Sequence, residues 1–308
     1  MHLSSRRFVP KVTPEIIAVG GGKGGVGKTC FSANLAVEIG QKGWRVILVD
    51  CDLSCSNLDT VLGANPEQRL DHFFHQRGTK DLGSVAQQTE YTNVRLVAGT
   101  TGLLDVANPR FQQKEALTRE LQRLDADVVI ADLGAGAHLN TLDFFLVSES
   151  NGIVVLTPEK TSIDNAFKFL RSALYRKIER FYKSPEVAAL LRHNVTLREF
   201  IRAVREAEAF DPAVKRQICG EMVALAKSMR PKLVVNRVNN EYEAQLTSNI
   251  LSKSLREHLM IEPEYLGCMV FDTVVSEAVN SGVPFVMSHP RQPISSCIAE
   301  MVNRLGYI

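Results

Sequence analysis

The chain has 308 residues, of which 45% are hydrophobic, and its formal net charge is +2. This length suits one large α/β domain or two modest ones, and the near-neutral charge creates no general demand for nucleic acid or an anionic membrane. No apolar run reaches the ~20 residues that cross a bilayer, residues 1–14 lack a signal-peptide core and the six cysteines form no disulfide framework, so we expect a cytoplasmic protein.

Short apolar runs alternate with helical patterns along the chain, at residues 16–20, 46–50, 94–98, 128–132, 152–157, 232–236 and 266–270. Strands that are buried on both faces have this pattern, and their alternation with helices predicts a doubly wound, mostly parallel α/β sheet. Ligands of such sheets bind at the carboxyl ends of the strands. Polar residues and glycine occupy several of those ends: Gly20, Asp50, Asp132, Thr157 and Asn236.

The first run leads into GGGKGGVGKTC, residues 20–30. Four residues fit the phosphate-loop pattern G-x-x-x-x-G-K-[ST]: Gly22, Gly27, Lys28 and Thr29. We expect Lys28 to reach the β- and γ-phosphates of ATP and the Thr29 hydroxyl to bind Mg²⁺. The loop residues expected to contact the nucleotide are Gly22, Lys23, Gly24, Gly25, Val26, Gly27, Lys28, Thr29 and Cys30.

A second lysine, Lys23, follows the first glycine of this pattern. The string KGGVGKT resembles the deviant Walker-A loop of the MinD/ParA superfamily of ATPases. The resemblance implies a P-loop fold and an ATP-dependent homodimer in which Lys23 reaches the nucleotide of the opposite subunit, as a catalytic residue alongside Lys28. The alternative is a solvated surface lysine.

The second run continues as VDCDLSCSNLD, residues 49–59. This segment resembles the switch I region of the superfamily, which implies that Asp52 lies near the attacking water and the metal. A carboxylate can orient water and bind Mg²⁺ through water. The alternative is that Asp52 only caps the following segment.

The run at 128–132 ends in DLGAG. An aspartate after a buried strand and before a glycine-rich turn is typical of Walker-B metal ligation, so we expect a Mg²⁺ site formed by Thr29, Asp52 and Asp132. Gly134 is expected to let the backbone sense the γ-phosphate. Residues 132–167 are similar to the FlhG/FleN regulators of flagellar number, within the same superfamily.

Residues 162–230 contain no strand pattern. Apolar side chains at three- and four-residue spacing predict a crossover helix from Ser162 and additional helices over 184–230. A capping box at Thr196–Glu199 and the pair Asp211–Pro212 mark two helix starts. The expected organisation is an N-terminal extension, 1–14, and a P-loop ATPase domain, 15–308, with the helical insertion as docking site for a regulatory protein.

Asn236 and Arg237 follow the next strand. The resemblance implies that Asn236 reads the adenine edge, as a bidentate amide can, and it covers residues 15–163 and 232–308. The final helical pattern is expected to belong to the domain core, which gives no reason to expect membrane anchoring from the C-terminus.

The sequence therefore predicts a Mg²⁺-ATP-dependent ATPase that acts as a nucleotide-switched dimer in spatial or numerical control of a cellular structure. A DNA-segregating ATPase and, less strongly, a metallocluster carrier are the alternatives. DNA binding is possible through the basic helix at 168–183, although such a stripe is more often a solvated face. His72 and His75 follow Cys51 and Cys55 in the sequence, but a zinc or iron–sulfur site would need four well-placed ligands. Two cysteines at this spacing more often act as small apolar side chains.

Overall fold

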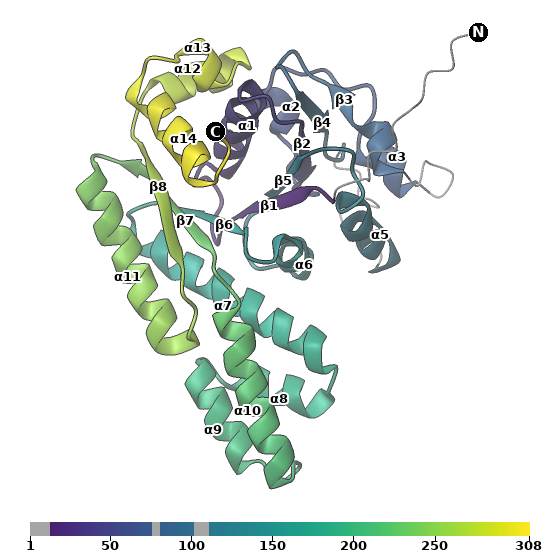
Figure 1. Cartoon of the computed structure of the whole chain (residues 1–308), viewed down its shortest axis with the longest axis vertical. Helices are drawn as coiled ribbons and strands as arrows, with labels where there is room; N and C mark the ends of the chain where they lie inside the picture. The colour runs from purple at the N-terminus through teal and green to yellow at the C-terminus, as the bar shows by residue number, and fades with distance from the viewer. Residues whose placement is uncertain (1–12, 76–80, 102–110) are drawn as a thin grey trace.

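The computed structural model describes residues 13–75, 81–101 and 111–308 (Figure 1). All but the last two residues of the predicted N-terminal extension, 1–14, lie outside the described residues. The described chain forms an eight-stranded sheet in the order β3-β4-β2-β5-β1-β6-β7-β8. The strands are β1 (Glu15–Gly20), β2 (Val46–Cys51), β3 (Gln87–Gln88), β4 (Val94–Val97), β5 (Val128–Leu133), β6 (Ile153–Leu156), β7 (Lys232–Val238) and β8 (Glu264–Val270).

The predicted doubly wound, mostly parallel α/β sheet is confirmed. Each of the seven predicted runs forms a strand, and these seven pair in parallel. The sequence missed β3, which pairs antiparallel with β4 and is only two residues long, too short to show a period. β7 extends past its predicted end because a bulge lets it continue pairing with β8 beyond Asn236.

Helices cover both faces of the sheet. Successive side chains of β1 point to opposite faces, so they belong to two different core clusters. Ile17 and Val19 join one core cluster, while Ile16 and Ala18 join the other. The first cluster lies under α1 (Lys28–Gln41), α2 (Leu58–Val61), α12 (Val274–Ser281), α13 (Phe285–Ser288) and α14 (Pro293–Arg304). The second lies under α3 (Leu70–Phe74), η1 (Leu82–Val85), α5 (Phe111–Leu121), α6 (Leu139–Phe145), η2 (Leu146–Ser148), α7 (Lys160–Tyr182) and α11 (Glu241–Leu259).

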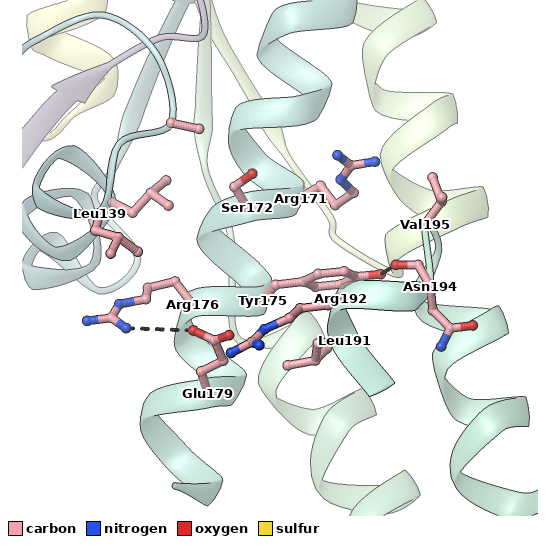
Figure 2. Close-up of a pocket in the computed structure, with 12 residues that line it drawn as sticks. Leu139, Arg171, Ser172, Tyr175, Arg176, Glu179, Leu191, Arg192, Asn194 and Val195 are labelled. Atoms are coloured by element: carbon pink, nitrogen blue, oxygen red, sulfur yellow. Dashed lines mark hydrogen bonds and ion pairs between the residues drawn. The ribbon is translucent and has the colours of Figure 1, made fainter. Parts of the chain in front are cut away.

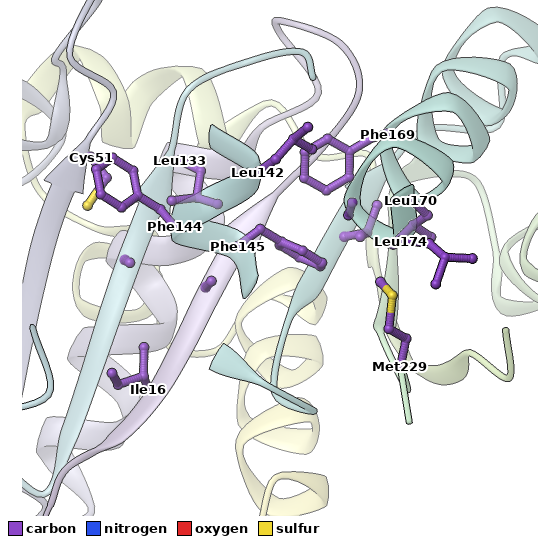
Figure 3. Close-up of a cluster of buried hydrophobic side chains, with 14 of the residues drawn as sticks. Ile16, Cys51, Leu133, Leu142, Phe144, Phe145, Phe169, Leu170, Leu174 and Met229 are labelled. Carbon is purple, nitrogen blue, oxygen red and sulfur yellow. The ribbon is translucent and has the colours of Figure 1, made fainter. Parts of the chain in front are cut away.

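The second core cluster fixes the end of β1 against α6 and α7 (Figure 3). The rings of Phe145 and Phe169 meet edge to face with centroids 5.0 Å apart. A Cβ atom at Gly20 would lie 2.9 Å from the Phe169 ring, so a side chain there would have to displace the aromatic pair. The start of the phosphate loop therefore rests directly on the core.

The segment that was expected to carry extra helices contains α8 (Pro185–His193), α9 (Leu197–Glu206) and α10 (Pro212–Lys227). The predicted capping box at Thr196 and the Asp211 cap are both present. The crossover helix α7 begins at Lys160, two residues before the predicted start. Figure 1 shows α8, α9 and α10 extending beyond the end of the sheet, alongside the C-terminal half of α7.

The three added helices share their apolar contacts with the body of the protein. Phe200 of α9 and Met222 of α10 are fully buried in the cluster that contains Phe169 of α7. Helix α10 packs on α7, and α9 packs on α11. Among the described helices, none has the length and apolar character needed to span a bilayer.

Candidate functional site

The loop between β1 and α1 is a tight turn whose shape depends on two glycines. Gly25 has φ +73° and Gly27 has φ +92°, a left-handed region that side chains disfavour. Gly27 is the N-cap of α1 and supplies no side-chain cap. The first N–H groups of the helix therefore point toward the loop, where they can donate hydrogen bonds to an anion.

The first half of this loop packs against α7 without room for a side chain. A Cβ atom at Gly22 would lie 1.9 Å from the carbonyl oxygen of Asn165. At Gly21 the nearest atom would be the carbonyl oxygen of Val155, at 2.8 Å. Gly22, predicted from the phosphate-loop pattern, thus has a second role, because with Gly21 it allows the loop to rest on the crossover helix and β6.

Lys28 lies at the start of α1 and is only 7% exposed. Its Nζ is 3.5 Å from the carbonyl oxygen of Lys23. Burial lowers the pKa of this lysine, while the negative charges of Asp132 and Asp52 act in the opposite direction. A cation with so little water around it gains from an anionic ligand in the loop.

Lys23 takes a different position, exposed at the start of α7. Its Nζ lies 3.5 Å from Thr161 Oγ1. The pKa of the neighbouring Glu159 is lowered by a hydrogen bond from the Thr157 hydroxyl and, to a smaller extent, by the charges of Lys23 and Arg237. The sequence did not indicate this contact between the phosphate loop and the first turn of the crossover helix.

Two buried carboxylates lie side by side at the end of the sheet. Asp50 on β2 and Asp132 on β5 are cross-strand partners, and each is 1% exposed. Burial, with the neighbouring Asp50 charge, raises the pKa of Asp132 to about 7, although hydroxyls of Thr29 and Ser32 donate hydrogen bonds to it. Burial also raises the pKa of Asp50 to about 6. Ser32, whose Oγ lies 2.8 Å from Asp132 Oδ1, was missed because no loop pattern includes it.

Asp50 organises the segment that follows β2. Its carboxylate accepts a hydrogen bond from the Ser56 hydroxyl at 2.7 Å and from the backbone N–H groups of Asp52, Asn57 and Leu58 at 3.1–3.2 Å. The last two N–H groups lie at the start of α2. Asp50 therefore holds the switch I-like segment onto the sheet.

Asp52 caps the next turn, and its charge acts on Lys28 at the phosphate loop. Its Oδ1 accepts hydrogen bonds from the Ser54 hydroxyl and from the N–H groups of Ser54 and Cys55. Its Oδ2 accepts none from the described residues. A Cβ atom at Gly134 would lie 3.1 Å from this carboxylate, so the loop after β5 packs directly on Asp52. Capping and a role toward the nucleotide are thus compatible.

The loop after β5 is tied to the phosphate loop. The N–H of Gly136 donates to the carbonyl oxygen of Gly21 at 3.2 Å, and Gly136 has φ +83°. Ala135 lies 3.8 Å from the Cβ position of Gly24. The glycine-rich turn of the DLGAG segment therefore forms one wall of the same site.

A cleft of about 620 Å³ continues from the phosphate loop toward β7 and β8. Asn236 lines it and donates from Nδ2 to the carbonyl oxygen of Val26 at 2.8 Å, while its Oδ1 accepts the N–H of Arg237. One amide N–H and one lone pair remain for a ligand. Arg237, at φ +59°, occupies the bulge of β7.

The sequence missed most of the wall of this cleft. Asn57 lines it from the segment after β2, and the other missed residues include Met269, Val270, Phe271, Asp272, Val275, Ser276, Val279 and Asn280. Met269 and Val270 end β8 and the other six residues follow it, and no charge or glycine pattern marks them. Their position depends on the long-range packing of α12 against α2.

The residues expected to bind Mg²⁺ fit a hard cation. Asp132 is a buried carboxylate next to a second one, and the Thr29 hydroxyl donates to it. Two such carboxylates lack a nearby cation other than Lys28 in the described part of the chain, so a divalent ion would relieve their repulsion. Among the described residues, no three or more His, Cys, Asp or Glu side chains are grouped to hold a metal ion without other ligands, so Mg²⁺ would also need oxygen ligands from Thr29, water or the nucleotide. His72 accepts the N–H of Arg69.

Comparisons with known proteins find a matching nucleotide-binding domain and similar proteins. The model of the CobQ/CobB/MinD/ParA nucleotide binding domain matches residues 17–285. The antiactivator FleN of Pseudomonas aeruginosa is 31% identical over 159 residues, which are 51% of this chain and 55% of FleN. The flagellum site-determining protein YlxH of Helicobacter pylori is 28% identical over 183 residues, which are 59% of this chain and 61% of YlxH.

The solved structures share the fold at lower identity. The septum site-determining protein MinD from Pyrococcus horikoshii, complexed with Mg-ADP, has a TM-score of 0.65 and 19% identity, covering 95% of this chain and 96% of that one. The match between this chain and the two curated relatives spans little more than half of their length. The predicted resemblance to MinD/ParA proteins and to FleN-type regulators is confirmed.

Gly22→Ala is expected to weaken nucleotide binding by at least tenfold, because the new Cβ would push the phosphate loop off the Asn165 carbonyl. Titration with a fluorescent ATP analogue measures the change. Gly220→Ala is the control, since nothing lies within 4 Å of its Cβ position in α10. Wild-type affinity in Gly22→Ala would contradict the observed packing of the loop.

The Asp132 pKa predicts a pH-dependent stability in the absence of Mg²⁺ and nucleotide. The folded pKa of about 7 lies above the unfolded value of ~3.9, so unfolding releases a proton between these values and stability falls as pH rises through this window. In Asp132→Asn, the free energy of unfolding should fall less steeply with pH, by roughly 1 kcal/mol per pH unit. Urea unfolding between pH 5 and pH 7 measures this slope. The surface change Asp164→Asn is the control; an unchanged slope in Asp132→Asn would contradict the prediction.

Proposed function

Because the chain belongs to the CobQ/CobB/MinD/ParA nucleotide-binding family, we propose that it is a Mg²⁺-dependent cytoplasmic ATPase that hydrolyses ATP to ADP and phosphate and works as a nucleotide-switched dimer. One observation carries the proposal: the buried Lys28 cation and the buried Asp50–Asp132 pair flank a single glycine loop. The loop opens into a cleft of about 620 Å³, of the size that takes a nucleoside.

Each residue has a specific task in this proposal. Lys28 and the N-terminal N–H groups of α1 bind the phosphates, and Asn236 with the cleft wall receives the base. Thr29 and Asp132 hold Mg²⁺ directly or through water, with Asp52 beside them. The ion, when bound, neutralises charge on the β- and γ-phosphates.

Asp52 is suited to orient the attacking water. Its Oδ1 is fixed by three hydrogen bonds from residues 54 and 55, which hold the side chain in place. Its Oδ2 has no hydrogen-bond donor among the described residues and can accept one from water. A carboxylate held rigidly by one oxygen and open at the other positions a nucleophile without a change of rotamer.

The dimer switch is supported by the difference between the two loop lysines. Lys28 is buried over its own loop, whereas Lys23 is exposed and touches Thr161 at the surface. An exposed flexible ammonium can reach the phosphates of a second subunit that faces the loop. ATP then favours the dimer, and hydrolysis releases the monomers.

The proposed output is spatial or numerical control of a cellular structure, through a regulatory protein that docks on the helical insertion. FleN is named an antiactivator and YlxH a flagellum site-determining protein, which supports this class of output. The basic stripe of α7 gives little support to DNA binding, since Lys168 pairs with Asp164 and both Arg176 and Arg180 pair with Asp143.

Lys23→Ala should bind ATP with near wild-type affinity, remain monomeric with a non-hydrolysable analogue and hydrolyse ATP about 10³-fold more slowly, because the trans cation is lost. Lys23→Arg should restore only part of the activity, since a planar fork replaces a slim ammonium. Light scattering with and without nucleotide measures dimerisation, with the exposed Lys253→Ala as control. An ATP-dependent dimer of normal affinity in Lys23→Ala would make Lys23 a surface residue only.

Two substitutions separate the capping role of Asp52 from its proposed role in hydrolysis. Asp52→Asn keeps an oxygen that can cap Ser54 but removes the charge, whereas Asp52→Ala removes both. Both variants should bind ATP and lose hydrolysis by two or more orders of magnitude with Mg²⁺ in excess. Near-normal turnover in Asp52→Asn, together with lost turnover in Asp52→Ala, would mean that Asp52 only caps the turn and does not position the attacking water.

A further inference from the structure

A second cavity, of about 370 Å³, lies away from the phosphate loop where the added helices meet the body of the protein (Figure 2). Its walls come from the start of α6, the middle of α7, the end of α8 and the turn before α9. The Tyr175 hydroxyl donates to the carbonyl oxygen of Asn194 at 3.1 Å and ties α7 to that turn. We call this feature the insertion groove.

The insertion groove carries uncompensated positive charge. Arg176 donates two hydrogen bonds to the Asp143 carboxylate, at 2.7 and 2.9 Å, and forms an ion pair with Glu179 at 3.6 Å, so its charge is neutralised. Arg171 and Arg192 also line the groove, and neither has an ion-pair or hydrogen-bond partner for its side chain in the part of the chain that the structure describes. Two guanidinium groups are therefore available to bind carboxylates bidentately.

Apolar side chains flank these two arginines. Leu139 is 59% exposed and Val195 is 57% exposed, on opposite sides of the groove. Leu142 and Leu191 also line the groove and are buried. A mixed surface of this kind is covered by a segment that carries apolar and acidic side chains together. The phosphate backbone of a nucleic acid fits this surface less well, because the walls are partly apolar and the carboxylate of Glu179, which also lines the groove, would repel phosphate.

We propose that the insertion groove binds an acidic amphipathic segment of a regulatory protein, with carboxylates on Arg171 and Arg192 and an apolar side chain between Leu139 and Val195. The proposal rests on the proposed function and names the partner class of the insertion. The chain's own residues 1–12 do not match, because they include Arg6, Arg7 and Lys11 and no acidic residue. Charge complementarity thus points to a separate protein.

A short segment after β5 joins the insertion groove to the nucleotide site. Ala137 and Leu139 line the groove, and they directly follow the loop in which Gly134 packs on Asp52 and Gly136 bonds to Gly21. A shift of that loop with the γ-phosphate moves the groove wall. The coupling is reciprocal, so a bound segment changes nucleotide affinity by the same factor.

The test is a selection of random displayed 12-residue peptides on the full chain, with Mg²⁺ and a non-hydrolysable ATP analogue, followed by anisotropy measurements on the enriched peptides. Enriched peptides should carry two or more acidic residues with an apolar residue between them. The double variant Arg171→Glu/Arg192→Glu should bind them at least tenfold more weakly, and the exposed Arg205→Glu on α9 should bind them normally. Affinity should differ between the ATP analogue and ADP.

Three results would overturn the inference: no peptide that depends on both arginines, enriched peptides without acidic residues, or equal affinity in the two nucleotide states. Binding of duplex DNA or phosphatidylglycerol vesicles that is lost in the double variant would also overturn it, by assigning the arginines to phosphate. ATP hydrolysis and dimerisation of the double variant are measured in parallel. If the chain hydrolyses ATP and dimerises normally but binds no such peptide, the groove proposal is wrong and the proposed function stands. If the chain binds peptides through both arginines but has no ATPase activity, the proposed function is wrong and the groove proposal stands.

Discussion

The site depends on the burial of opposite charges at one end of a parallel sheet. Lys28, Asp50 and Asp132 are each less than 10% exposed, and burial is the largest influence on the pKa of all three groups. Desolvation at this scale costs several kcal/mol per ion unless partners repay it. The hydroxyls of Thr29 and Ser32 and the charge of Lys28 offset part of that cost at Asp132, whereas the register that places Asp50 beside Asp132 adds repulsion. A nucleotide with its metal would supply the remaining partners.

The need to keep these charges in place explains the close backbone contacts around the loop. Gly20, Gly21 and Gly22 rest on a phenylalanine ring, on β6 and on α7, and none leaves room for a Cβ atom without movement. A loop with side chains there would stand away from the sheet and admit water, which would weaken every electrostatic interaction in the site. Glycine therefore fixes the position of the loop as well as its turn.

The sequence predicted the parts of the protein that follow from local patterns. The seven longer strands, the phosphate loop and the caps at Thr196 and Asp211 each have a signal within a few residues. It could not predict the fourfold use of Asp50 as an acceptor or the bond from Asn236 to Val26, because these contacts join distant segments. The cleft wall after β8 and the surplus of arginines in the insertion groove likewise appear only when helices are packed.

Helix α7 joins these distant contacts into one mechanical element. Its first turn contacts Lys23 through Thr161, its second turn supports Gly22 through Asn165, and Phe169 lies beneath Gly20. Its C-terminal half carries α8 and α10. A helix of 23 residues is about 35 Å long, so α7 spans the distance from the phosphate loop to the added helices. Helix α7 is thus one continuous element between the phosphate loop and the added helices, so a rigid displacement of its start would carry α8 and α10 with it.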